Sequence, residues 1–326
     1  MDTSFAALVE RFLHHFGTRK PSPNTIAAYR RDLVGVSQRL ALAAGLEVDQ
    51  LALGDLTKNN LRAAFASWAE DHAGASIRRA WSAWNAFFDS LVADDLIDGN
   101  PMAAVQPPKP VRGRAKVIQG DDVVPRLLRT AAEFDATARH PWPSRDLALT
   151  ATFVITGVRL SEAVEMNIGS MEGPVGARRL VVTGKGNKTR SIPVEASYEQ
   201  LLGIYLSERQ DRFPRHRLDH PASPLFVRAD NGERPSRQQV QYLIEKLYRR
   251  AAIRSQVPKG ALVHALRHTF ATSALDHGID VVELQELLGH SSLDTTRRYL
   301  EATGQQLREA IRAHPAQTAL REVVPD

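Results

Sequence analysis

Six residues of the chain could share one site that acts on a phosphate: Arg159, Lys185, His264, Arg267, His290 and Tyr299. Arginine binds phosphoryl oxygens in a bidentate manner, and lysine and histidine add further donors. Cationic donors of this kind stabilise the negative charge that develops on a phosphate in the transition state. A tyrosine hydroxyl can attack such a phosphate and hold it as a covalent ester. The set therefore predicts phosphoryl transfer through a tyrosine, with cations in the place of a metal.

Considered singly, these residues have ordinary structural explanations. Arg159 follows Gly157 at the end of an apolar helix, where an arginine often binds helix-end carbonyls. Lys185 lies in a glycine-rich turn between two β-prone runs, which by itself indicates a solvated basic hairpin tip. This turn is not a P-loop, because the GxxxxGK[ST] pattern is absent. Tyr299 lies on an expected helix, where a tyrosine usually belongs to an amphipathic core.

Two histidines four residues apart raise the possibility of a zinc site. His264 and His268 would lie on one face of a helix, a spacing that zinc ligands use. However, Ala265 stands where the metalloprotease motif has glutamate, and Arg267 between the histidines would repel a cation. The chain has no cysteine, which excludes disulfides and cysteine-based zinc sites. We therefore expect no metal and no cofactor.

The elements that would position these side chains are mainly helical. The first hundred residues carry apolar residues at helical spacing in four stretches, which predicts a small bundle. Thr57 is expected to begin the third helix, and Ser76 to cap the fourth. The β-prone runs 180–182 and 191–194 predict a hairpin. Helices resume after Ser236. The predicted fold is mainly α: a helical bundle, then a mostly α domain with a small antiparallel sheet.

A segment rich in proline and arginine predicts a boundary between two domains. The chain has 326 residues, enough for two domains that each bury a core. Proline runs resist helix formation and extend the chain, so we expect a linker at 107–116. The domains would then be 1–106 and 117–326.

The composition is that of a soluble globular protein with a modest basic charge. The net charge of +5 suits nucleic acid or an anionic membrane surface, although many basic proteins bind neither. No apolar run is long enough to cross a bilayer, and the N-terminus does not resemble a signal peptide. We expect a cytoplasmic, nucleoid-associated protein with no membrane partner.

Taken together, the residues resemble the tyrosine recombinase (phage integrase) family, over nearly the whole chain. The TGxRxSE-like segment is 156–162, and the hairpin lysine lies in 184–188. The HxLRHTFAT motif is 264–272, and the LGHSS motif is 288–292. Tyr299 lies nine residues after His290, the histidine of the LGHSS motif. After it the sequence reads Leu-Glu-Ala-Thr, whereas the family often has Thr-His.

The resemblance implies a role for each site residue. Tyr299 would attack the scissile phosphate of DNA, leaving a 3′-phosphotyrosine and a free 5′-hydroxyl. Arg159 and Arg267 would hold the non-bridging oxygens, and Lys185 would be the general acid for the departing 5′-oxygen. The remaining three have supporting roles: proton shuttle for His264, phosphate contact for His290 and acidic buttress for Glu162.

The N-terminal bundle is similar to the SAM-like core-binding domain of the family, which clamps DNA from the side opposite the catalytic domain. Candidate DNA contacts are Arg30, Arg31, Lys58, Arg78 and Arg79 in the bundle, and Arg234, Ser236 and Arg237 in the catalytic domain. Each of them could equally lie on a solvated helix face.

The resemblance also implies an assembly. The tail, about 303–326, would exchange as a helix between subunits, giving a tetramer on two DNA duplexes. The partner is a double-stranded recombination site, with a second recombinase or an accessory protein as a further possibility. The biological task would be dimer resolution of the Xer type, or integration and excision of a phage or mobile element. The alternatives are a DNA-binding protein that lost the chemistry and a type IB topoisomerase.

Overall fold

The computed structural model describes residues 4–18, 23–107, 117–118, 120, 122–184, 187–258 and 260–289. Backbone contacts divide the chain into two compact units, 1–112 and 113–326. The expected linker beyond residue 107 and the expected tail lie outside the described residues. Within the described ranges, no helix is both long enough and apolar enough to cross a membrane.

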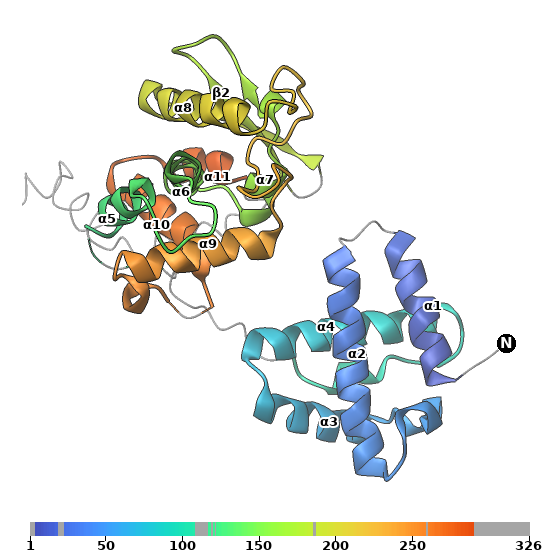
Figure 1. Cartoon of the computed structure of the whole chain (residues 1–326). Helices are drawn as coiled ribbons and strands as arrows, with labels where there is room; N and C mark the ends of the chain where they lie inside the picture. Colours follow the sequence, from blue (N-terminus) through green and yellow to red (C-terminus); the bar gives the residue numbers. More distant parts are fainter. Residues whose placement is uncertain are drawn as a thin grey trace, which may run out of the picture. The chain divides into compact units, whose positions relative to one another are not determined.

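The first unit is a bundle of helices with an aromatic core. Its helices are α1 (Phe5–Thr18), α2 (Pro23–Ala44), α3 (Lys58–Asp71) and α4 (Gly74–Ala93). Short 3-10 helices at Val48–Gln50 and Leu53–Asp55 lie between α2 and α3, and another at Pro101–Ala104 follows α4. In Figure 1, α1 and α2 lie side by side and cross the direction of α3 and α4. Phe5 stacks on Trp84 with ring centroids 5.8 Å apart, and Phe12 meets Phe87 edge-on at 5.7 Å. The predicted bundle is confirmed.

Of the helix starts predicted at Thr57 and Ser76, the first is confirmed and the second is wrong. Thr57 caps α3 as expected, because its hydroxyl accepts a hydrogen bond from the amide of Asn60 at 3.3 Å. The expectation for Ser76 is wrong, since α4 begins two residues earlier, at Gly74. The carbonyl of Ala73 accepts from the amides of Ser76 and Ile77, at 2.8 and 3.1 Å, so the helical turn is already closed there.

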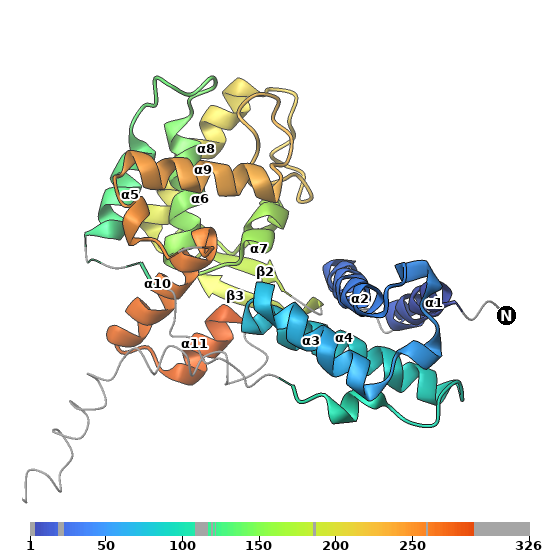
Figure 2. The same ribbon diagram turned by 90° about the horizontal axis from the view of Figure 1, so that it is seen from below.

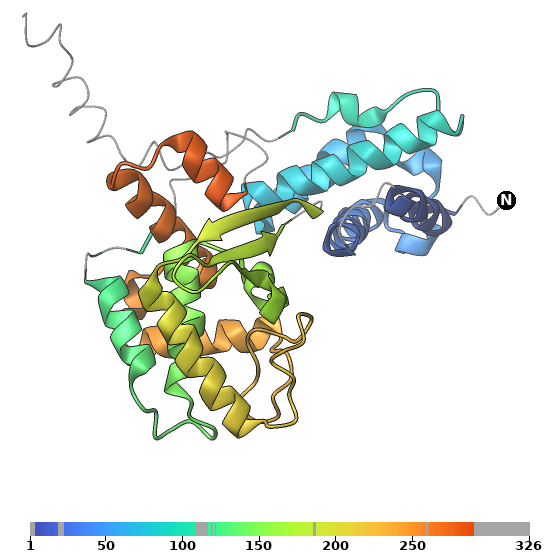
Figure 3. The ribbon, with the colours of Figure 1, turned by 90° about the horizontal axis from the view of Figure 1, so that it is seen from above.

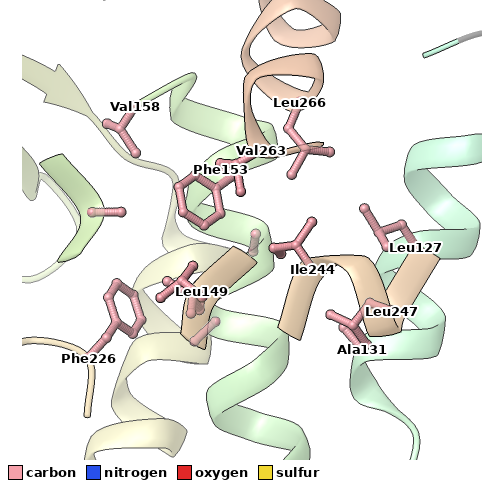
Figure 4. Packing of buried hydrophobic residues seen from close by; sticks show 14 of the residues in the cluster. Leu127, Ala131, Leu149, Phe153, Val158, Phe226, Ile244, Leu247, Val263 and Leu266 are labelled. Carbon is pink, nitrogen blue, oxygen red and sulfur yellow. The ribbon is translucent and has the colours of Figure 1, made fainter. Parts of the chain in front are cut away.

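The second unit packs helices around α6. The helices are α5 (Val123–Ala132), α6 (Pro143–Thr156), α7 (Leu160–Glu165), α8 (Ala196–Arg212), α9 (Arg237–Arg250), α10 (Leu262–Asp276) and α11 (Val281–Leu288), with further short 3-10 helices at Ile168–Ser170 and Arg254–Gln256. Figure 4 shows Phe153 of α6, Ile244 of α9 and Leu266 of α10 gathered in one apolar interior. Seen from below, α9 lies across α6 (Figure 2).

A small antiparallel sheet completes the second unit. It contains β1 (Met171–Glu172), β2 (Arg179–Thr183) and β3 (Thr189–Pro193) in that order. The last two strands form the predicted hairpin, and Figure 3 shows the sheet beside α11. Val182 pairs with Arg190, and Leu180 pairs with Ile192. Residues directly opposite in such a ladder share a face, so Arg190 lies on the face that buries Leu180 and Ile192.

Candidate active site

A left-handed turn after α6 places Arg159 at the start of α7. Gly157 ends α6 with φ +60°, a conformation that glycine adopts without steric cost. A Cβ atom on Gly157 would also lie 2.4 Å from Cδ1 of Phe270, so the turn leaves no room for a side chain. Arg159 then occupies the N-cap position of α7.

Glu162 holds Arg159 from inside the protein. Oε2 of Glu162 accepts the backbone N–H of Arg159 at 2.7 Å, and Oε1 accepts from Nη1 of the same arginine at 2.7 Å. The side chain of Glu162 is 4% exposed, whereas that of Arg159 is 35% exposed. Glu162 therefore holds the backbone N–H and Nη1 of Arg159, while part of that arginine's side chain stays in contact with solvent.

A second guanidinium, from Arg190 on β3, closes the other side of this carboxylate. Its Nη1 and Nη2 donate to Oε1 and Oε2 of Glu162 at 3.1 and 2.7 Å. Burial by itself raises the pKa of Glu162. The hydrogen bonds from Arg190 and Arg159, with the charge of Arg190, outweigh burial and lower that pKa to about 2. Glu162 is therefore a carboxylate at neutral pH.

Arg267 of α10 is held by two backbone carbonyls. It is 1% exposed, and its Nη1 and Nη2 donate to the carbonyl oxygens of Gly157 and Leu288, each at 2.6 Å. The first carbonyl ends α6 and the second ends α11, so Arg267 joins the ends of two helices. Helix-end carbonyls lack intrahelical donors and carry partial negative charge, which suits a guanidinium.

One pocket collects three of the six residues that the sequence singled out. Arg159, His264 and Arg267 line a cavity of about 200 Å³, together with residues 260–263 and Gln241. His264 is exposed, and its ring meets that of His268 edge-on with centroids 4.4 Å apart. Two arginines and a histidine thus line one space, and side chains of these types can donate charge-assisted hydrogen bonds to a phosphate.

The other three expected residues, Lys185, His290 and Tyr299, lie outside the described residues. The described residues next to Lys185 and His290 border the site. A Cβ atom on Gly184 would lie 3.4 Å from Oε1 of Glu162, and Gly289 ends α11 with φ +62°. In the part of the chain that is described, no group of three or more metal-binding side chains is assembled.

The basic residues expected to contact DNA in the first unit occupy two kinds of environment. Arg30 forms an ion pair with Glu10. Arg79 donates two hydrogen bonds, of 2.7 and 2.9 Å, to the buried carboxylate of Asp32. The other three, Arg31, Lys58 and Arg78, are exposed.

The three candidates of the second unit also differ. Arg234 is half-buried and donates to the carbonyl oxygens of Val164 and Met166 and to the side chain of Asn167. Ser236 caps α9, and only Arg237 among the three is an exposed cation.

Sequence reasoning missed Arg190 and the backbone carbonyls of the site. Arg190 closely follows the glycine-rich turn, whose composition by itself indicates a solvated basic hairpin tip, yet its side chain is only 9% exposed. Strand alternation carries the signal, because Arg190 lies two residues before the buried Ile192 on the same strand. The carbonyls of Gly157 and Leu288 have no comparable signal, since every residue has one.

Comparison with known protein families finds two matches in this chain. A model described as the phage integrase family matches residues 119–306. A model described as the N-terminal SAM-like domain of phage integrases matches residues 9–95.

Individual proteins with similar sequences are named tyrosine recombinases. XerC of Bradyrhizobium diazoefficiens is 34% identical over 96% of this chain and 95% of its own length. XerD of Mycobacterium leprae is 33% identical over 91% of this chain and 93% of its own length.

Solved structures share the fold at lower sequence identity. XerH bound to its difH substrate before cleavage has a TM-score of 0.68 at 21% identity, over 88% of this chain and 79% of that chain. A lambda integrase tetramer bound to a Holliday junction has a TM-score of 0.64 at 18% identity, over 91% of this chain and 77% of that chain.

Proposed function

The chain belongs to the phage integrase family and is a site-specific tyrosine recombinase, and on that basis we propose that it breaks and rejoins DNA strands through Tyr299. The substrate would be a double-stranded recombination site. Each strand would be held by a covalent bond to the enzyme between cleavage and rejoining, so that no energy source is needed.

The proposed step is an in-line displacement at phosphorus. The phenolic oxygen of Tyr299 forms a bond to the scissile phosphorus, and the bond from phosphorus to the 5′-oxygen breaks. The proton of the phenol passes to His264, while Lys185 gives a proton to the departing 5′-oxygen. The products are a 3′-phosphotyrosine and a 5′-hydroxyl. Attack by the 5′-hydroxyl of a second strand reverses the step and completes the exchange.

The observation that carries this proposal is the convergence of Arg159, His264 and Arg267 on one pocket. The two arginines come from segments more than a hundred residues apart and are each anchored by protein acceptors. Anchored guanidinium groups are already oriented when negative charge grows on the non-bridging oxygens, which is the condition for electrostatic catalysis. His290 would add a further donor to the same phosphate, from the segment that follows α11.

For DNA binding, we propose that the domain 1–106 clamps the duplex against the domain 117–326. All five candidate cations of the first unit are exposed, and Arg31 and Lys58 are the first candidates for phosphate contacts. Arg30 and Arg79 have carboxylate partners and would contribute less net charge.

We further propose a tetramer on two duplexes, in which the tail at about 303–326 exchanges between subunits. Two tasks at the nucleoid fit this chemistry: resolution of chromosome dimers, with or without a second recombinase, and movement of a phage or mobile element. The sequence of the cleaved DNA distinguishes them.

The test uses nicked DNA duplexes tiled from the region around the gene, with EDTA present. We expect the wild type to form a denaturant-resistant adduct and Tyr299→Phe to form none. Tyr242→Phe is the matched control, because Tyr242 is 69% exposed and is not among the residues that line the cavity of Arg159, His264 and Arg267. This control should form the adduct at the wild-type level.

Other outcomes separate the alternatives. Specific binding without an adduct, even with candidate partner recombinases added, would support a DNA-binding protein that lost the chemistry. Cleavage and relaxation of one duplex without exchange between two would support a topoisomerase. An adduct that survives Tyr299→Phe would show that another residue is the nucleophile.

A further inference from the structure

We propose that Arg190 is a positioning residue for strand cleavage. It fixes the position of Arg159 and that of the C-terminal end of α11, the helix that precedes His290 in the sequence. This inference rests on the proposed function. Arg190 acts through other groups: it is absent from the lining of the cavity that Arg159, His264 and Arg267 share.

The first group that Arg190 orients is the carboxylate of Glu162. The guanidinium of Arg190 binds both oxygens of that carboxylate, and the same two oxygens accept from the backbone and side chain of Arg159. The side chains of Arg190 and Glu162 are 9% and 4% exposed, so water competes little for these bonds. Rotation of Glu162 would move Arg159, and the two-point contact with Arg190 opposes that rotation.

The second group is the last turn of α11. Nε of Arg190 donates to the carbonyl oxygen of Leu287 at 2.7 Å. The next carbonyl, of Leu288, accepts from Arg267 at 2.6 Å and from Arg159 at 3.5 Å. Three guanidinium groups therefore bind the negatively polarised end of one helix.

The backbone leaves room for this arrangement at Gly289. A Cβ atom there would lie 3.2 Å from both Cδ and Nη1 of Arg190. The glycine thus permits the side chain of Arg190 to pass close to the chain, in addition to adopting a positive φ. His290 directly follows Gly289 in the sequence, so Arg190 binds α11 at the end that is nearest in sequence to His290.

Coupling between two parts of the site follows from these contacts. A single side chain joins the segment of Arg159 to the segment before His290, and both would contact the same phosphate in the proposed reaction. Loss of Arg190 would leave each segment folded but free to shift. Misplacement of catalytic groups by about 1 Å can lower a rate by roughly 100-fold.

The experiment compares Arg190→Gln and Arg190→Lys with the wild type in single-turnover cleavage of a nicked duplex at saturating protein. DNA affinity and the melting temperature are measured beside the rate. Arg179→Gln is the matched control, because Arg179 lies on the neighbouring strand β2, is 54% exposed and pairs only with Glu172 in the described residues. We expect Arg190→Gln to cleave roughly 100-fold more slowly with DNA affinity within about threefold of wild type. The control should match the wild-type rate.

A double-mutant cycle with Glu162→Gln tests the route of the effect. If Arg190 acts through Glu162, the double variant should cleave no more slowly than the slower single variant. Both substitutions would then remove the same interaction, so their effects would not add. Arg190→Lys should recover part of the rate, since lysine keeps the charge and loses the two-point contact.

Several results would overturn the inference. A folded Arg190→Gln that cleaves at the wild-type rate would show that the residue is only structural. Equal losses of affinity and rate would make it a DNA contact instead. If Arg190→Gln does not fold, Arg190→Lys decides, and a wild-type rate in that variant rejects the proposal. Absence of cleavage by the wild type itself would reject the proposed function, and the positioning role with it.

Discussion

At the scale of single residues, a buried carboxylate joins two arginines that lie 31 positions apart in the sequence, Arg159 and Arg190. Burying an anion is costly unless donors satisfy it, and Glu162 accepts four hydrogen bonds from these two residues. Removal of Glu162 would leave two guanidinium groups without the acceptor that they share. The three side chains therefore act as a unit, and we expect the effects of substitutions among them not to add.

The low pKa of Glu162 makes stability depend on acid. The folded-state pKa is about 2, below the ordinary value of 4.5, so the unfolded chain binds this proton more tightly. The stabilisation is fully present above pH 4.5 and is lost as the pH falls towards 2. It amounts to about 3 kcal/mol at most. We expect Glu162→Gln to flatten the fall in the free energy of unfolding of this unit between pH 5 and 2.

The measurement is urea unfolding at a series of pH values. Glu172→Gln removes the same charge at an exposed position and should leave the acid dependence close to that of wild type. A wild-type slope in Glu162→Gln would show that the carboxylate is not held as described.

At the scale of elements, α11 is a short helix that is capped by Asp280, the residue before its first. The side chain of Asp280 accepts the amide of Val282 at 2.7 Å, and that of Glu283 accepts the amide of Asp280 at 3.2 Å. We expect Asp280→Ala to cost about 1 kcal/mol and to speed hydrogen exchange of the amides from 284 to 289. Strand cleavage should slow as well, because the carbonyls that bind Arg190 and Arg267 lie in this helix.

The matched control is Thr57→Ala, which removes the corresponding cap of α3 in the other unit. It should speed exchange in α3 and leave α11 unchanged. Unaltered exchange in α11 of Asp280→Ala would mean that tertiary packing, and not the cap, holds the helix.

The sequence predicted elements better than orientations. Apolar spacing identified the bundle, and two β-prone runs identified the hairpin, because burial imposes a period on each element. The expected cap at Ser76 failed because the backbone closes the first turn of α4 without a side chain. The inward orientation of Arg190 was missed because the basic, glycine-rich turn indicates exposure to solvent. The alternation along the strand, which places Arg190 on the same face as Ile192, was the better signal. Contacts to carbonyls, such as that of Leu288, depend on tertiary geometry that no local pattern encodes.

At the scale of the whole molecule, each of the two units has its own large apolar cluster. Trp84 belongs to the cluster of the first unit and Phe153 to that of the second, and both are fully buried. Replacing either by alanine should cost about 3 to 5 kcal/mol. We expect Trp84→Ala to speed hydrogen exchange in α2 and not in α6, and Phe153→Ala to do the reverse.

Each variant serves as the control for the other, with exchange read by mass spectrometry on peptic fragments of the full chain. If either substitution accelerated exchange equally in α2 and α6, the chain would unfold as a single cooperative unit. Independent behaviour would mean that damage to the first unit leaves the candidate site of the second unit intact.

The use of the Leu287 and Leu288 carbonyls by arginines has a consequence for how this protein can vary over evolutionary time. A contact made by the main chain survives most codon changes at its own position. Leu287 is half-buried, so selection can exchange its side chain for others of similar size without altering the contact. A comparison of conserved side chains would therefore overlook these two carbonyl contacts, which do not depend on the side chains at positions 287 and 288.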